Sequence, residues 1–359
     1  MALALSASCF GQVTGVRAVT PAQPLDKIAT AIVDDFSIDS LRNNLNLLAS
    51  DELEGRGTPS KGLNAAADYI AQYFAEIGLE PAVGDSYFQT VTVAELGQQG
   101  ARLQPAVDAG APDFMHNVAG ILRGSDPALR DTYIIVSAHY DHVGIGGEGP
   151  DRIFNGANDD ASGTSSVMAI ARVLAGLDEA PRRSVLFLLF FGEERGRLGS
   201  QYYRDHPIVP LTETIADINL EHMGRTDMDG VKLEREANVT GFDFSTLTDT
   251  IVSASRAVGI SIVKNDRYSD QFFNQSDNQI LAQAGIPAHT VSVGYLFPDY
   301  HKPSDHADKI DFDNMAAVDR GIALAVWRLA DSDQVPTWND TLPATVQYRE
   351  AASHLHTAE

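Results

Sequence analysis

The sequence predicts an α/β fold with a mostly parallel central sheet sandwiched by helices. Four short runs are almost entirely apolar, which is typical of strands buried on both faces: YIIVSA (133–138), SVLFLLFF (184–191), TIADINL (214–220) and AHTVSV (288–293). Segments with apolar residues at helical spacing lie between and around these runs. Buried strands that alternate with amphipathic helices indicate a parallel sheet with helices packed on its faces.

The composition fits such a fold and excludes several classes of partner and site. The chain has 359 residues, of which 44% are hydrophobic and 21% are charged, so it can bury a large core. A net charge of -23 argues against nucleic acid or an anionic membrane as a partner, because both bind basic surfaces. Cys9 is the only cysteine, which excludes intrachain disulfides and thiolate zinc sites.

The first half of the chain contains two predicted helices and three predicted strands. Residues 38–49 form a helix with an apolar face of Ile38, Leu41, Leu45 and Leu48. A second helix ends at Gly78 and has an apolar face of Leu63, Ala66, Ala67, Ile70, Phe74 and Ile77. Short strands are predicted around 87–94 and 117–122, before the buried strand 133–138.

The second half alternates more regularly between helix and strand. Helices are predicted over 165–177, 244–258 and about 312–330, with the three remaining buried strands between them. The last helix buries Met315, Val318, Ile322, Val326 and Leu329. Residues 332–359 are polar, and we expect them to form a ragged C-terminal tail.

Titratable side chains follow the buried strands at the points where they end. SAHYDHVG places His139 and Asp141 after the first strand, GEE places Glu193 and Glu194 after the second, and NLEH places Glu221 after the third. In open α/β sheets, binding sites gather at the carboxyl ends of the strands. Two loops add further candidates: NGANDDASG, with Asp159 and Asp160, and PDYHKPSDHADKID, with His301, Asp305 and His306.

Imidazoles and carboxylates without a thiolate suit zinc or another divalent first-row metal. Two metals about 3.5–4 Å apart need roughly five side-chain ligands, one of them bridging, and a base that does not ligate. The clusters contain enough side chains for that arrangement. Metal ions would also supply the compensating positive charge that a pair of glutamates at the end of a core strand needs.

These motifs resemble the zinc-dependent exopeptidase family of co-catalytic di-zinc aminopeptidases. That family is related to glutamate carboxypeptidase, the transferrin receptor ectodomain and the glutaminyl cyclases. The resemblance runs from about Leu48 to Asp331, and its motifs include LASDELEGRGTPSKG, VSAHYDHVG, NGANDDASG, FGEERGRLGSQYY and PDYHKPSDHADKID. It implies a phosphorylase/hydrolase-like fold with two zinc ions per chain.

The resemblance also implies a role for each matching residue. One metal would be bound by Asp159, Glu194 and His301, and the other by Asp159, His139 and Glu221, with Asp159 bridging. Asp141 would orient His139, as carboxylates commonly do for metal-bound histidines. Glu193 would be the general base, and Tyr300 would donate a hydrogen bond to the developing oxyanion.

One position departs from the family pattern, which commonly has Asn-Leu-Asp where this chain has Asn219-Leu220-Glu221. Glutamate is one methylene longer, so the second position is expected to be looser or differently occupied. The interval between SYFQTVTV and HNVAG is also too short for a protease-associated domain, so we expect a single catalytic domain over 25–331.

Other titratable side chains near the motifs have simpler interpretations. Asp160 is expected to fix its loop and cap the following helix. His142 and His306 are expected to order loops, and His222 to lie outside the metal shell or on the surface. His289, inside a strand, is interpreted as a core histidine with its hydrogen bonds satisfied.

The predicted function is an aminopeptidase that hydrolyses amino-terminal residues from peptides through a metal-bridged water. A glutaminyl cyclase-like single-zinc enzyme and a carboxypeptidase of the same family stay open as alternatives, and a non-catalytic receptor-like module is the weakest one. GIGGEG (144–149) is not a dinucleotide loop because Pro150 follows and no helix begins there. The absence of a G-x-S-x-G motif disfavours a serine nucleophile.

The amino-terminal end suggests export from the cytoplasm. Residues 1–24 begin with small and apolar residues and are interpreted as a leader, which is either a truncated export signal or the result of a wrongly assigned start. No apolar run reaches the roughly 20 residues that span a bilayer. We therefore expect a periplasmic or extracellular protein without a transmembrane segment.

Overall fold

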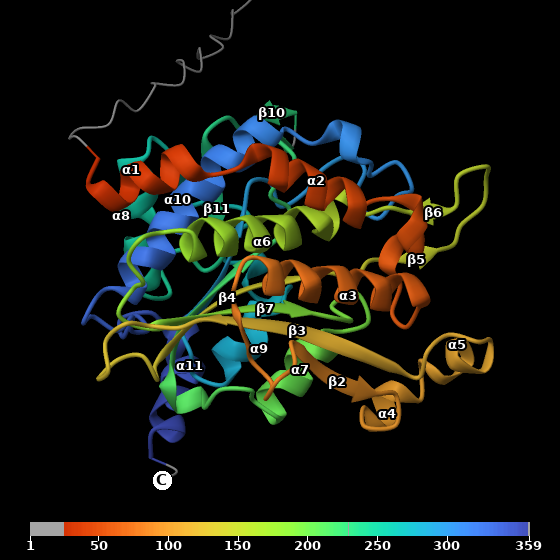
Figure 1. The fold of residues 1–359 in the computed structure, drawn as a ribbon, viewed down its shortest axis with the longest axis horizontal. Coiled ribbons are helices and arrows are strands. Elements are labelled where there is room, and N and C mark those ends of the chain that lie inside the picture. The colour runs from red at the N-terminus through yellow and green to blue at the C-terminus, as the bar shows by residue number, and fades with distance from the viewer. Residues whose placement is uncertain (1–24, 229, 358–359) are drawn as a thin grey trace, which may run out of the picture.

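A computed structural model describes residues 25–228 and 230–357 of the chain, so the predicted leader lies outside the described residues. Its centre is a nine-stranded sheet in the order β1-β3-β7-β4-β8-β13-β11-β12, with β2 paired to β3 (Figure 1). The strands of this sheet are β1 Glu80–Pro81, β2 Phe88–Thr92, β3 Phe114–Leu122, β4 Tyr133–His139, β7 Ser184–Phe190, β8 Thr214–Leu220, β11 Glu236–Val239, β12 Ser261–Val263 and β13 Ala288–Ser292.

The middle of the sheet is parallel, antiparallel pairs flank it on both sides, and the last pair, β11 with β12, is parallel again. Strand β4 pairs in parallel with β7 and β8, and β8 pairs in parallel with β13. Antiparallel pairs join β3 to β7 on one side and β11 to β13 on the other. The carboxyl ends of β7, β4 and β8 therefore lie side by side at one edge of the sheet, as the sequence predicts.

Helices cover both faces of the sheet (Figure 1). The larger layer contains α1 Lys27–Asp35, α2 Ile38–Leu48, α3 Lys61–Glu76, α6 Ser162–Ala175, α8 Leu247–Ala257 and α10 Phe312–Ala330. The smaller layer contains α7 Leu198–Asp205, α9 Asn278–Gln283 and α11 Val346–Leu355. The short helices α4 Gly97–Gly100 and α5 Gln104–Asp108 lie beyond β2.

The central strands serve both layers because their side chains alternate between the faces. In β4, Ile134 and Val136 belong to the core under the larger layer, whereas Ile135 belongs to the core under the smaller one. The side chains of strand β7 alternate between the same two cores. This two-sided burial explains why the strands are continuous apolar runs in the sequence.

The segment after Asp331 differs from the expected ragged tail. Helix α11 buries Tyr348, and Trp338 is 7% exposed and donates from Nε1 to the carbonyl of Gly285 at 2.9 Å. Trp338 stacks on Tyr348 and contacts Phe273. Three aromatic side chains thus anchor a mostly polar segment to the smaller layer, and the prediction of a ragged tail was wrong.

Two short hairpins lie outside the main sheet. Strand β5 Gly144–Ile145 begins the glycine-rich segment GIGGEG and pairs with β6 Ile153–Phe154, and β9 Asp227–Met228 pairs with β10 Val231–Lys232. Within the described ranges, none of the helices combines the length and the apolar character that crossing a membrane requires.

Candidate metal centre

Candidate ligands from five segments meet at the carboxyl edge of the sheet. His139 is the last residue of β4, Glu194 follows β7, and Glu221 follows β8 directly. Asp159 lies in the irregular turn Ala157–Ala161 that leads into α6, and His301 lies in the loop between β13 and α10. The sheet therefore brings together all five ligands that the family resemblance implies.

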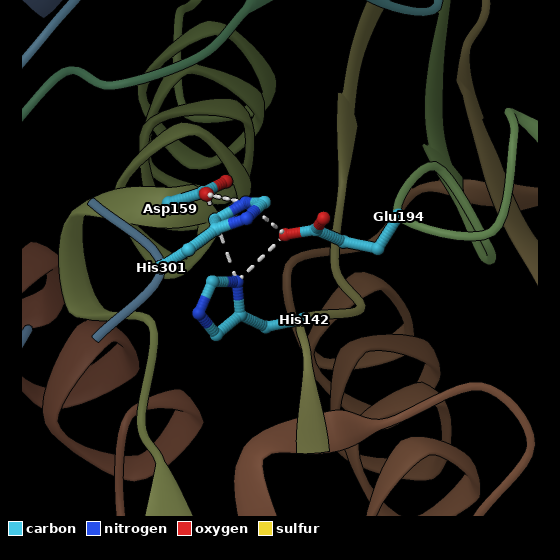
Figure 2. Close-up of side chains that lie close together, drawn as sticks. All are labelled: His142, Asp159, Glu194 and His301. Carbon is cyan, nitrogen blue, oxygen red and sulfur yellow. Dashed lines mark ion pairs between the residues drawn. The ribbon is translucent and has the colours of Figure 1, made fainter. Parts of the chain in front are cut away.

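The first group consists of His142, Asp159, Glu194 and His301, whose nitrogen and oxygen atoms face one another (Figure 2). His301 Nε2 lies 3.1 Å from both Asp159 Oδ2 and Glu194 Oε1. His142 Nδ1 lies 2.9 Å from Glu194 Oε1 and 3.7 Å from Asp159 Oδ2. Two imidazoles and two carboxylates thus surround one point.

The second group consists of His139, Asp159 and Glu221. His139 Nε2 lies 3.5 Å from Asp159 Oδ1 and 3.9 Å from Glu221 Oε1. Asp159 therefore offers Oδ2 to the first group and Oδ1 to the second. This is the geometry of a bridging carboxylate between two neighbouring positions.

The residues of both groups fit divalent metal ions. Several of their buried polar atoms make no hydrogen bond: His139 Nε2, both ring nitrogens of His142, Asp159 Oδ2 and Glu194 Oε1. Buried polar atoms without partners are costly, and all of these atoms except His142 Nε2 face another candidate ligand atom. Nitrogen and oxygen donors of this kind match the ligand preference of zinc.

Backbone contacts hold Asp159 in place. The carboxylate of Asp305 accepts hydrogen bonds from the backbone nitrogens of Asn158 at 2.9 Å and of Asp159 at 3.1 Å. Asp160 turns the other way and accepts from the nitrogens of Gly163 and His222. Asp160 thus caps the first turn of α6 and lies outside both groups, as the sequence interpretation expected.

Asp141 contacts both the first histidine and the glutamate pair. Its Oδ1 lies 3.5 Å from His139 Nδ1 and accepts a hydrogen bond from the backbone nitrogen of Glu193 at 3.0 Å. Burial lowers the pKa of His139, but Asp141 and the nearby carboxylates outweigh it, so the pKa is raised well above its usual value. Asp141 is thus placed to orient His139 and to fix the start of the turn that carries Glu193.

Glu193 and Glu194 face different surroundings although they are adjacent. Burial, together with the negative charges of Asp277 and Glu221, raises the pKa of Glu193 well above its usual value. Burial also acts on Glu194, but the neighbouring imidazoles of His142 and His301 lower its pKa. The turn after β7 therefore places the carboxylate of Glu194 beside His142 and His301, whereas the carboxylate of Glu193 forms no ion pair with either histidine.

A cavity opens beside the two groups. Its wall contains carboxylates of both groups together with Glu193, and the rest of the lining includes Thr240, Phe272, Thr290, Ser292, Tyr295, Leu296 and Tyr300. Tyr300 is 41% exposed and stacks on His301 with ring centroids 3.9 Å apart. Tyr300 therefore lies at the entrance, next to the first group.

His142 is the residue that the sequence interpretation placed wrongly. It was expected to order a loop, but it is fully buried and belongs to the first group. Its position three residues after His139, at the same strand end, was the available signal. His306 does fit a loop role, because its Nε2 lies 3.4 Å from Asp151 and its side chain is 42% exposed.

Of the other two histidines, only His289 has a clear structural role. His222 is buried and belongs to neither group, although its Nε2 makes no hydrogen bond and lies 3.5 Å from Asp159 Oδ1 and 3.8 Å from Glu221 Oε1. His289 has its Nδ1 2.7 Å from the carbonyl of Thr240 and its Nε2 2.6 Å from Ser245 Oγ, and burial lowers its pKa to about 4.

Comparisons with known proteins agree with this geometry. A probable zinc metalloprotease of Pyrenophora tritici-repentis is 25% identical over 92% of this chain and 74% of its own length. Aminopeptidase YwaD of Bacillus subtilis is 26% identical over 61% of this chain and 46% of its own length.

Solved structures show the same fold. The LapA aminopeptidase of Legionella pneumophila superimposes with a TM-score of 0.64 at 18% identity, over 91% of this chain and 81% of that one. The aminopeptidase of Aneurinibacillus sp. strain AM-1 gives a TM-score of 0.62 at 19% identity, over 86% of this chain and 97% of that one.

The family model of peptidase family M28 matches residues 117–326, a range that contains every residue of both groups. The chain therefore belongs to peptidase family M28 and is a metallopeptidase.

Proposed function

We propose that this metallopeptidase is an aminopeptidase that uses two zinc ions and removes one residue at a time from the amino terminus of peptides. The observation that carries the proposal is the pair of ligand groups that share Asp159 beside a closed, acidic cavity. Zinc bound at these groups would lower the pKa of a coordinated water and polarise the scissile carbonyl.

Glu193 is the proton carrier in this proposal. It lines the cavity, and its backbone is held by Asp141 rather than by a ligand histidine. A carboxylate oxygen of Glu193 takes the proton of the attacking water and then passes it to the nitrogen of the leaving amine. Tyr300, at the entrance, donates a hydrogen bond from its hydroxyl to the oxyanion that develops on the substrate carbonyl.

The cavity supports action at an amino terminus. It ends against Thr240, Thr290 and Ser292, which are buried residues in or beside the strands, so a peptide has no path beyond them. The carboxylates of Glu194 and Glu221 line the same cavity and attract the cationic α-amine of the substrate. The aromatic rings of Phe272 and Tyr295 are placed to contact the first side chain.

The alternatives make different demands on this cavity. A carboxypeptidase needs a cation for the substrate carboxylate, but the described residues that line the cavity include neither lysine nor arginine. The nearby Arg225 is already paired with Asp227 and Asp299. A glutaminyl cyclase-like enzyme works with one zinc, whereas two ligand groups are present.

A panel of chromogenic aminoacyl substrates tests the proposal, with each substrate supplied both with a free amine and as its N-acetyl derivative. We expect chelator-sensitive release from the free amines alone, and restored activity after addition of zinc. Equal cleavage of the blocked substrates would contradict aminopeptidase action. Ammonia release from amino-terminal glutamine would favour the cyclase instead.

The subcellular location is also a proposal. We propose that the protein is exported, because residues 1–24 begin with small and apolar residues as export signals do. Detection of the processed protein outside the cytoplasm would support this, and its retention in the cytoplasm with residues 1–24 intact would contradict it.

A further inference from the structure

His142 lies where a ligand would lie, although the family resemblance does not include it in the metal shell. Both of its ring nitrogens are buried and make no hydrogen bond. Its Nδ1 faces Glu194 and Asp159, and its ring meets that of His301 edge-on with centroids 5.5 Å apart (Figure 2). A buried imidazole with two unpartnered nitrogens is costly unless a group from outside the protein pairs with it.

The surrounding backbone forms a space that fits the ring of His142. Its backbone nitrogen donates to the carbonyl of Arg56 at 3.2 Å. A Cβ on Gly156 would lie 2.5 Å from the ring atoms Cγ and Cδ2, so only glycine leaves room for the imidazole. Arg56 also donates from Nη2 to the carbonyl of Gly156 at 3.0 Å. The same residue therefore fixes the backbone of His142 and the backbone of Gly156 relative to each other.

A buried histidine with a purely structural role has a different environment in this same protein. His289 uses both ring nitrogens on the chain, in contacts with Thr240 and Ser245. His142 uses neither of its nitrogens on the backbone or on a hydroxyl. Its nearest polar atoms are the carboxylate oxygens of Glu194 and Asp159, which are themselves candidate ligands.

We propose that His142 supplies a fourth protein ligand, through Nδ1, to the position formed by Asp159, Glu194 and His301. The two metal positions are then unequal, because the other has three protein ligands, His139, Asp159 and Glu221. A position with four protein donors is nearly closed and binds its metal first and most tightly. The three-donor position keeps more open coordination, so it exchanges its metal more readily and admits substrate atoms.

This inference rests on the proposal of two metal positions, but it holds whichever peptide bond the enzyme hydrolyses. Calorimetric titration of the full-length apoprotein with zinc tests it. The wild type should show one tight and one weaker zinc-binding step. In His142→Ala, the dissociation constant of the tight step should rise tenfold or more. Glu221→Gln should affect the weaker step alone, and His306→Ala, a matched histidine at the rim, should change neither.

X-ray absorption at one zinc per chain tests the ligand directly and does not depend on a variant. We expect two imidazoles around this first zinc in the wild type, from His142 and His301. A single imidazole in the wild type, or an unchanged tight step in His142→Ala, would overturn the inference. Uptake of only one zinc at saturation would contradict the two-metal proposal, and the imidazole count would still decide the role of His142.

Discussion

At the scale of single residues, Arg56 holds together the backbone segments around the metal centre, although it forms no hydrogen bond with a ligand side chain. Its fully buried guanidinium donates to the carbonyls of Leu48, Tyr140, Asn155 and Gly156. Those carbonyls belong to the end of α2 and to the segments that carry His142 and Asp159. Burial lowers the pKa of Arg56 to about 10, so it stays charged at neutral pH and offsets the nearby buried carboxylates.

We predict that Arg56→Lys destabilises the protein and weakens metal binding together. Lysine keeps the charge but cannot reach four carbonyls in a planar arrangement, so buried acceptors lose their donors. The loss should be about 3 kcal/mol or more in the free energy of unfolding, measured by urea denaturation. Arg195→Lys, at an exposed position, is the control, and equal stability of the two variants would show that Arg56 contributes no more than a surface arginine.

We predict that Glu193→Gln keeps its zinc and loses most of its turnover. Glutamine preserves the shape and the backbone contact with Asp141 but cannot accept the proton, so kcat should fall by about 10²–10⁴-fold. Kinetics and metal analysis of the same preparation measure both properties. Glu194→Ala should instead lose metal, and unchanged turnover in Glu193→Gln would exclude it as the general base.

At the scale of elements, the sequence predicts best what is buried on both faces. Strands β4, β7, β8 and β13 were located because complete burial makes them continuous apolar runs. Helix α7 was missed because its residues LGSQYYRD are mostly polar, and α11 because it buries only Tyr348. Short helices on the smaller layer gain their stability from tertiary contacts that no local pattern records.

The candidate ligands were located for a related reason, since three of them end or follow buried strands, and Asp159 and His301 lie in loops with long motifs. His142 could not be assigned from the sequence, because a histidine beside a motif has the same local pattern whether its ring turns inward or outward. Its direction depends on the glycine at position 156 and on Arg56, which approach only in the folded protein.

The contact between α6 and α10 gives a prediction about pH. Asp319 of α10 is fully buried and accepts from Ser166 of α6 at 3.0 Å, and burial raises its pKa to about 8. The unfolded chain ionises Asp319 near pH 4, so between about pH 4 and pH 8 the contribution of this side chain to the stability of the wild type falls as the pH rises.

Asp319→Asn removes this penalty, so its stability relative to the wild type should grow by about 1.4 kcal/mol for each pH unit in that range. Urea denaturation at pH 5 and at pH 8 measures the difference. Asp313→Asn, at an exposed position on the same helix, is the control. A difference between Asp319→Asn and the wild type that does not change with pH would refute the prediction.

At the scale of the whole molecule, the fold gathers negative charge that it does not neutralise by itself. The chain has a net charge of -23, and Asp159, Glu194 and Glu221 meet at one edge of the sheet. Histidines separate these carboxylates, but several ligand atoms lack hydrogen bonds. Metal binding and folding stability should therefore be coupled.

We predict that a chelator lowers the melting temperature and that zinc restores it. A ligand that binds only the folded state adds about 1.4 kcal/mol of stability per site for each tenfold rise in its free concentration above the dissociation constant. Calorimetry across a zinc series measures this slope, with magnesium as the control ion. A melting temperature that changes with neither chelator nor zinc would show that metal binding at this centre does not contribute to folding stability.

The spread of the ligands along the chain also affects how the protein matures in a cell. His139 is made long before His301, and at about 5–20 residues per second the ribosome needs roughly 8–30 s to synthesise the segment between them. During that interval the growing chain holds an incomplete set of ligands with exposed carboxylates. The position formed by His142, Asp159, Glu194 and His301 is therefore completed only after the loop around His301 has been made, whereas His139, Asp159 and Glu221 of the other position are all synthesised earlier.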